Sequence, residues 1–281
     1  MCILGELIYF LKGLNNYTNF LKLTEVAPCV GFCILGVIKV ATVQLQKQKV
    51  GDIISKLEQM YNNADESYVA MNALLGADLL FSFLTGHLCM HFDLLAQRVA
   101  RIGFQDGESN RDALNQISNK SRNVMMHKEL VDCIQRHKVL IGISEELEKI
   151  FSFSIFMNFS GSSVLICLVG FQTTAVTGVA LFMFLIFLIS MVVQIYQLCD
   201  AGHQLIEKSE SLSKSIYESD WNNCDRKFKR SAQILMARAQ KPQKLTALRF
   251  SVVSLTSFGK VMSTSWSYFT LLQTVYQGPK D

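Results

Sequence analysis

Residues 227–245 read KFKRSAQILMARAQKPQKL, and residues 250–276 read FSVVSLTSFGKVMSTSWSYFTLLQTVY. The first segment is basic, whereas the second contains one formal charge, Lys260, between Arg249 and Lys280. A basic flank before about 25 mostly apolar residues, with aromatic residues near the far end, predicts a membrane-spanning helix whose basic side lies in the cytoplasm. Serine and threonine are too frequent here for a helix that faces only lipid. We therefore expect this helix to pack closely on other helices or to line water.

The composition of the whole chain agrees with a membrane protein. The 281 residues are 50% hydrophobic and only 18% charged, and the mean hydropathy is +0.25. These values favour an all-α, polytopic membrane helical bundle with long cytoplasmic helical extensions. The net charge of +4 comes from basic clusters beside the predicted spans. Because no nucleic-acid-binding module accompanies these clusters, we expect the lipid bilayer as a partner and no nucleic acid.

Apolar segments divide the chain into regions. Residues 1–23 are interpreted as a partial first span and an outer loop with a glycosylation sequon at Asn16. Residues 24–199 form the predicted transmembrane bundle, which includes a mixed-charge cytoplasmic loop at 98–149. Residues 200–249 form a basic, helical cytoplasmic region, and residues 250–277 form the last span. Within the bundle we predict four spans, at 24–45, 73–95, 150–172 and 175–199.

The first two of these spans create a conflict of orientation. Residues 24–45 end in basic QKQK, and residues 73–95 are followed by Arg98 and Arg101, so both ends are predicted to be cytoplasmic. Two consecutive spans cannot run in the same direction. Only about 25 mostly polar residues separate them, which leaves no room for a further span. Either one orientation is wrong or the chain lacks a span.

No cluster of residues predicts catalysis or metal binding. His87 and His91 have the i, i+4 spacing of two metal ligands. The remaining histidines lie in separate polar stretches, so a polar patch facing the bundle interior is the better interpretation. Lys39, inside the first predicted span, is expected to reach the cytoplasmic headgroups. The eight cysteines contain no CxxC motif, which argues against a disulfide framework. We expect no enzyme, no metal and no cofactor.

The C-terminal sequence is similar to the signature of insect odorant receptors. The resemblance rests on an aromatic and acidic element at Tyr217, Glu218 and Trp221, on RAQKPQKLTA at 238–247, and on SYFTLL at 267–272. Upstream, LTEVAPCVGFCILGVIK resembles the second span of that family, and HLCMHFDLLAQRV resembles the end of the fourth. Residues 1–11 and the join near Asn62 to Ser67 depart from it, since most of the first span and the third span are missing. This departure would explain the conflict of orientation, and it predicts a truncated chain.

The resemblance implies an odorant-gated, non-selective cation channel in the plasma membrane of olfactory sensory neurons. Members of the family have seven spans and assemble as heterotetramers with a shared co-receptor. The last span would line the pore, and the cytoplasmic region before it would make subunit contacts. The implied gate residues are Leu271 and Val275, with Thr274 near the outer mouth. The implied subunit contacts are Trp221, Arg230, Arg238 and Pro242.

The same resemblance places an odorant pocket within the bundle. The ligand would be a volatile small molecule in an apolar pocket. By span and depth, the candidate pocket residues are Phe32, Leu35, Phe81, Phe83, His87, Phe184 and Phe187. Two alternatives stay open: a truncated, non-functional isoform, and a channel of the gustatory receptor type.

Overall fold

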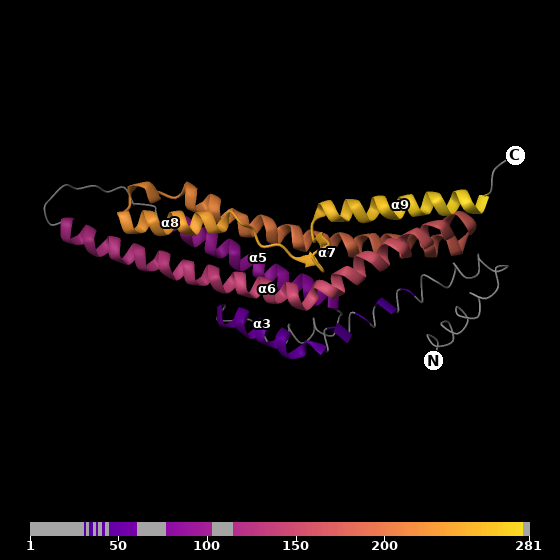
Figure 1. The fold of residues 1–281 in the computed structure, drawn as a ribbon, viewed down its shortest axis with the longest axis horizontal. Coiled ribbons are helices and arrows are strands. Elements are labelled where there is room, and N and C mark those ends of the chain that lie inside the picture. The colour runs from indigo at the N-terminus through magenta and orange to yellow at the C-terminus, as the bar shows by residue number, and fades with distance from the viewer. Residues whose placement is uncertain are drawn as a thin grey trace.

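The computed structural model describes residues 45–60, 77–102 and 115–277, together with single positions 31, 34, 35, 38, 41 and 42. The described part is an elongated bundle of helices with one short hairpin (Figure 1). In chain order its elements are α3 (Lys47–Met60), α5 (Ala77–Ile102), α6 (Asn115–Ala175), α7 (Val179–Glu218), the 3-10 helix η2 (Trp221–Asn223), α8 (Arg226–Ala239), β1 (Thr246–Ala247), β2 (Ser251–Val252) and α9 (Leu255–Gln277).

The two longest helices extend far beyond the thickness of a membrane. The 61 residues of α6 correspond to about 90 Å, whereas about 20 residues cross the hydrocarbon core. The predicted spans at 150–172 and 175–199 therefore continue without a break into polar helical extensions. This confirms the expected helical extensions of the bundle. Within 98–149, residues 115–149 belong to α6 and residues 98–102 to α5.

Three described helices are long and apolar enough to cross a membrane: Asp78–Ile102, Arg122–Ala175 and Val179–Glu218. The 23 residues of α9 span about 34 Å. However, α9 is not among these three helices, because its serines, threonines and Lys260 lower its hydropathy. Its sequence suits a helix that packs against protein or water better than one surrounded by lipid.

The chain reverses direction between α6 and α7 in three residues, Val176 to Gly178. Gly178 has a φ of 68°, a conformation that is accessible to glycine at little cost. Tyr276, near the end of α9, contacts the ring of Phe171 with centroids 5.3 Å apart. The α6–α7 turn and the end of α9 therefore lie at one end of the molecule, and α8 lies toward the other (Figure 1).

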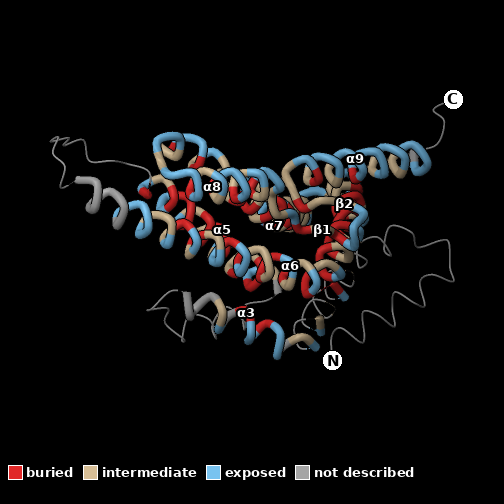
Figure 2. Tube along the Cα trace, turned by 60° about the vertical axis from the view of Figure 1, so that its left-hand side comes forward, coloured by how far each residue is buried: buried red, intermediate tan, exposed pale blue. Residues whose placement is uncertain are grey.

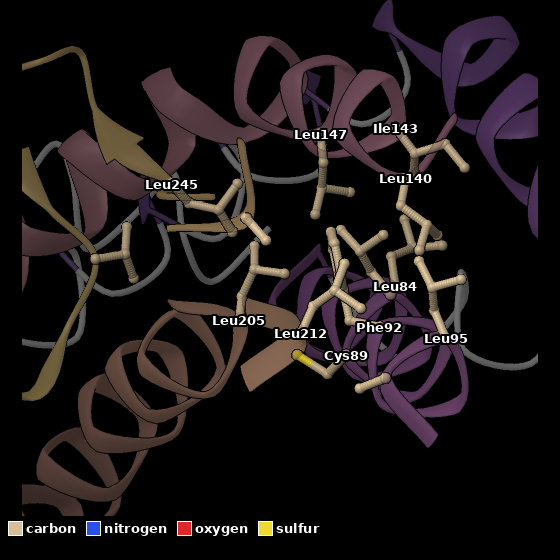
Figure 3. Close-up of a cluster of buried hydrophobic side chains, with 14 of the residues drawn as sticks. Leu84, Cys89, Phe92, Leu95, Leu140, Ile143, Leu147, Leu205, Leu212 and Leu245 are labelled. Carbon is tan, nitrogen blue, oxygen red and sulfur yellow. The ribbon is translucent and has the colours of Figure 1, made fainter. Parts of the chain in front are cut away.

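The described core has two parts. The larger cluster joins α5, the first part of α6, the second part of α7, α8 and the hairpin, and Leu84, Leu140 and Leu212 are fully buried in it (Figure 3). A smaller cluster near the α6–α7 turn contains Leu35 and Val169. The first half of α7 contributes residues to this cluster but is otherwise largely exposed (Figure 2).

The last helix begins later than the sequence suggested. Residues 250–254, expected as part of the last span, instead form the end of a hairpin in which Thr246 pairs with Val252 and Ala247 with Ser251. The N–H of Val253 also donates to the carbonyl of Leu245 at 2.8 Å. These bonds fold residues 245–253 into a hairpin, so that α9 begins only at Leu255.

Candidate functional site

The residues predicted for the gate lie on one exposed face of α9. The side chains of Leu271 and Val275 are 62% and 74% exposed, and Thr274 is also exposed. Residues four positions apart share a face of an α-helix, so these three side chains form one stripe near the end of α9. Figure 2 shows that α9 is pale blue along much of its length.

The opposite face of α9 packs on α6 and α7. Ser265 is 2% exposed, and its hydroxyl lies 3.3 Å from that of Ser163 on α6. A Cβ at Gly170 would lie 3.6 Å from the Phe269 ring, so this ring packs directly on the helix backbone. Small residues at both sides of a contact let two helices approach closely, as membrane helices commonly do. Because this face is occupied, the stripe that carries Leu271 points away from the subunit.

The predicted pocket residues do not form one group. Phe81 is buried in the larger cluster, with its ring centroid 5.3 Å from that of Phe151. Phe83 packs against the same cluster and contacts His87 edge-on, with centroids 4.3 Å apart. Leu35, Phe184 and Phe187 belong to the smaller cluster, and Phe32 lies outside the described residues.

The two groups lie at different depths. α5 and α7 run side by side in the same direction, because Asp78 is hydrogen-bonded to Gln194 and Asp93 is paired with Lys208. Phe81 follows Asp78 by three residues, whereas Phe184 precedes Gln194 by ten. At 1.5 Å per residue, the two phenylalanines are separated by roughly 20 Å along the bundle. A single small ligand would therefore contact one group or the other.

A polar cluster connects three helices between these two groups. Asp78 on α5 accepts hydrogen bonds from Asn158 on α6, at 3.2 Å, and from Gln194 on α7. Asn158 is 2% exposed, which excludes glycosylation of the sequon that begins there. Buried polar groups inside a membrane bundle usually pair with one another in this way. No spacing rule predicts this cluster from the sequence, because its three residues lie 36 to 116 positions apart.

A cavity of about 290 Å³ lies between α5 and α7, on the side of the polar cluster that is farther from the α6–α7 turn. Ser82, Gly86, Cys89, Gln197 and Asp200 are among its lining residues. None of the predicted pocket residues lines it. The histidines expected to face the bundle interior lie nearby: His91 is buried and His87 packs on Phe83. The described helices and hairpin contain no group of three or more ligating residues that could hold a metal ion.

The four predicted subunit-contact residues differ in how they are placed. Trp221 packs against the subunit's own core. Arg230 is exposed on α8, and Pro242 is half-buried in the segment that follows it. Arg238 donates from its guanidinium to the carbonyl of Lys241 at 3.1 Å, where a cation also suits the end of α8. Arg230 is therefore the member of this set most open to a partner.

Cys224 lies beside this region, between η2 and α8. Its Sγ is 3.6 Å from the carbonyl of Asp220. Burial raises the pKa of the Cys224 thiol, because removal from water disfavours the thiolate. Cys224 is thus a neutral, structural side chain that supplies no nucleophile.

Comparison with known proteins identifies the family. The family model described as 7tm Odorant receptor matches residues 66–266. Odorant receptor 13a of Drosophila melanogaster is 33% identical over 222 residues, which cover 73% of this chain and 50% of that protein. Odorant receptor 67c of the same species is 30% identical over 213 residues, covering 76% of this chain and 49% of the relative. The chain thus spans about half the length of these curated relatives.

A longer alignment shows where this chain and a relative differ in length. The match to odorant receptor 85d of Drosophila melanogaster, 22% identical, extends over 343 positions and covers 98% of this chain and 83% of the relative. These 343 positions exceed the 281 residues of the chain by 62. The relative therefore carries internal sequence that this chain lacks.

The fold agrees with the sequence comparisons. The solved structure of the insect olfactory receptor OR5 from Machilis hrabei, in complex with eugenol, superposes with a TM-score of 0.65 at 13% identity and covers 97% of this chain and 87% of that one. A second solved structure of the same receptor gives a TM-score of 0.64. The helical membrane bundle and the family match agree, and this chain belongs to the insect odorant receptor family.

Proposed function

We propose that this chain is the ligand-binding subunit of an odorant-gated, non-selective cation channel that assembles with a shared co-receptor in the plasma membrane of olfactory sensory neurons. The single observation that carries the proposal is the two-sided packing of α9. One face is buried against α6 and α7, and the other presents Leu271, Thr274 and Val275. A helix with one packed face and one exposed face can line one side of a central pore while it stays packed on its own subunit.

The proposed gate works by excluding water. Apolar side chains from neighbouring subunits at the level of Leu271 and Val275 would form a constriction too apolar to stay hydrated. Movement of α9 away from the axis would rewet the constriction and admit cations. Thr274, whose hydroxyl donates to the carbonyl of Thr270 at 2.9 Å, would provide a polar surface at the outer mouth.

The proposed ligand is a small, volatile, mostly apolar molecule. The Machilis hrabei receptor was solved with eugenol, which supports this class of compound. Leu35, Phe184 and Phe187 form the apolar group nearer the outer end, and we propose these, with Phe32, as its contacts. Phe81, Phe83 and His87 lie about 20 Å deeper, where we propose that they transmit changes of packing. The ligand opens the channel only to the extent that it binds the open state more tightly.

The test is to express the chain with the co-receptor and record currents evoked by an odorant panel that includes eugenol. We expect odorant-evoked cation current, and we expect Leu271→Ala to raise the resting current several-fold. The matched control is Leu272→Ala, because Leu272 is half-buried and is rotated by about 100° from Leu271, toward the side of α9 that carries Ser265. An equal effect of the two variants would contradict the assignment of the gate.

The alternative is a non-conducting product that only associates with other subunits. It rests on the internal sequence that odorant receptor 85d carries and this chain lacks. Surface expression together with no current across the panel would favour it and overturn the channel proposal. A reduced current from co-expressed full-length receptors would then identify the chain as an inert partner.

A further inference from the structure

A groove of about 440 Å³ runs between α6, the β1–β2 hairpin and α9. Phe156, Phe159 and Val164 of α6 line one side, and Tyr268 of α9 lines the other. Phe250 of the hairpin and Lys260 of α9 also line it. The groove therefore combines an apolar wall with one cationic side chain, and neither the gate nor the proposed odorant contacts use it.

The groove lies in the cytoplasmic half of the membrane span. About 20 helical residues cross the hydrocarbon core, so the membrane part of α6 extends from Ala175 back to about residue 155. Residues 156–164 occupy the half of this segment that is farther from the α6–α7 turn. Lys260 is five residues from the start of α9 at Leu255, or about 7.5 Å along its axis. The basic sequence before α9 marks the same end as cytoplasmic.

Lys260 needs a negative partner that the described chain does not supply. Its side chain is exposed, and no carboxylate in the described helices and hairpin forms an ion pair with it. A lysine inside a span is costly unless it pairs with an anion or reaches the headgroups. From its position near the start of α9, the lysine side chain can extend to the level of lipid phosphates.

The hairpin places a second cation and an aromatic ring at the same end of the groove. Leu248 and Arg249 have φ values of 49° and 63°, which are unusual for residues with a side chain. The N–H of Leu248 donates to the hydroxyl of Ser152 at 2.7 Å, and Thr246 donates to Glu148. These bonds hold the hairpin against α6, and its tip projects Arg249 outward.

Phe250, next to Arg249, is 83% exposed although it is one of the largest apolar residues. One side of its ring faces Phe156, with centroids 5.8 Å apart. Exposed aromatic rings beside basic residues are typical of the membrane–water interface. The hairpin tip thus matches the chemistry of the boundary between acyl chains and headgroups.

We propose that this groove binds one anionic phospholipid of the cytoplasmic leaflet. Lys260 and Arg249 would contact the phosphate and any further acidic group of the head, and an acyl chain would lie along Phe156, Phe159 and Val164. A neutral odorant would leave both cations unpaired. A zwitterionic lipid would neutralise their positive charge less than an anionic lipid does. The inference does not depend on whether the chain conducts ions.

The test uses the full chain in nanodiscs that contain phosphatidylcholine with or without phosphatidylserine. Lipid that stays with the protein after transfer to detergent is counted by native mass spectrometry, and the midpoint of thermal unfolding is measured in both membranes. We expect one retained phosphatidylserine and a higher midpoint in its presence. A juxtamembrane basic residue is worth about fivefold in binding to an anionic lipid. Lys260→Gln and Arg249→Gln should each reduce the preference for phosphatidylserine over phosphatidylcholine by about fivefold.

Two further variants separate charge from folding. Lys260→Arg keeps the charge and should retain the preference, and Lys244→Gln removes an exposed lysine that does not line the groove. Equal retention of phosphatidylserine and phosphatidylcholine by the unaltered chain would overturn the proposal. So would an equal loss in Lys260→Gln and Lys244→Gln. Photo-crosslinking from position 268 to a second protein chain would show a subunit in the groove instead of a lipid. These outcomes are independent of odorant-evoked current.

Discussion

At the scale of single residues, Gly202 shows how one missing side chain positions the last helix. It lies in the buried face of α7, directly against the segment between β2 and α9. A Cβ at this position would lie 2.5 Å from the carbonyl oxygen of Val253 and 2.6 Å from its Cγ1. Backbone atoms cannot move aside as easily as the end of a flexible side chain, so the contact requires glycine.

We therefore predict that Gly202→Ala displaces the hairpin and destabilises the fold by about 1–3 kcal/mol, a typical cost of overpacking. Gly142→Ala on α6 is the matched control. A Cβ there meets no atom within 4 Å, and alanine stabilises a helix interior by up to about 1 kcal/mol relative to glycine. The midpoints of thermal unfolding of the two variants in detergent should move in opposite directions. An unchanged midpoint for Gly202→Ala would show that the contact relaxes freely.

Nothing in the sequence around Gly202 predicts this role. The glycine occurs in the polar stretch CDAGHQL, and its partner Val253 is 51 positions away in the sequence. The three residues of the polar cluster around Asp78 were unpredictable for the same reason. In contrast, Leu271, Thr274 and Val275 were named from the resemblance of SYFTLL to the family. Helical spacing then predicts that they share one face, because all three lie within about one turn of α9.

At the scale of elements, the segment after α8 is attached to α7 through the buried hydroxyl of Ser209, in addition to the apolar contacts of α8 itself. The Ser209 hydroxyl accepts from the backbone N–H of Gln243 at 2.9 Å and donates to the carbonyl of Ile206 at 3.0 Å. Ser209 is 2% exposed, so water cannot readily replace it. This bond fixes the segment that leads from α8 into the hairpin.

Ser209→Ala should leave the Gln243 N–H without its hydrogen-bond partner. We expect this to lower the free energy of unfolding by about 1–3 kcal/mol. We expect amide hydrogen exchange to become faster in residues 240–246, with little change in α5. Ser213→Ala is the control, because the Ser213 hydroxyl is exposed and bonds only within its own helix, to Glu210 at 2.9 Å. If residues 240–246 exchange at the same rate in both variants, the Ser209 hydroxyl does not hold the segment after α8 in place.

The long helices were predictable, whereas the hairpin was not. Charge-poor segments of about 20 residues mark the membrane parts of α6 and α7, and helical periodicity continues into their polar extensions. The residues of β2 belong to the same apolar run as α9. Pairing with β1, the bond from Val253 to Leu245 and the contact with Gly202 separate them from the helix. All three depend on residues outside this apolar run.

At the scale of the whole molecule, the two hydrophobic clusters correspond to two environments. The larger cluster is a closed core among α5, α6, α7 and α8, as in a soluble bundle. The smaller cluster leaves the apolar first half of α7 exposed, which is favourable only in lipid or against further helices. Composition predicted a membrane part and a polar part, but the larger cluster also includes residues of the predicted spans, such as Leu84 and Ile155. The depth of the predicted pocket residues could not be predicted, because the level of α5 relative to α6 and α7 depends on contacts such as Asp78–Asn158.

The arrangement of the helices predicts which ends share a side of the membrane. The α6–α7 turn and the end of α9 lie together through the contact of Phe171 and Tyr276, whereas η2 and α8 lie at the opposite end (Figure 1). Basic residues concentrate on α8, from which we predict that this end lies in the cytoplasm. An epitope tag after Asp281 should therefore be detected on intact cells. A tag inserted between Asn223 and Cys224 should be detected only after permeabilisation. A tag inserted between Thr177 and Gly178 should, like the Asp281 tag, be detected on intact cells, because the α6–α7 turn lies beside the end of α9. Detection of the Asp281 and Asn223 tags on the same side would contradict the fold, whereas exchange of the two patterns would contradict only the orientation inferred from charge.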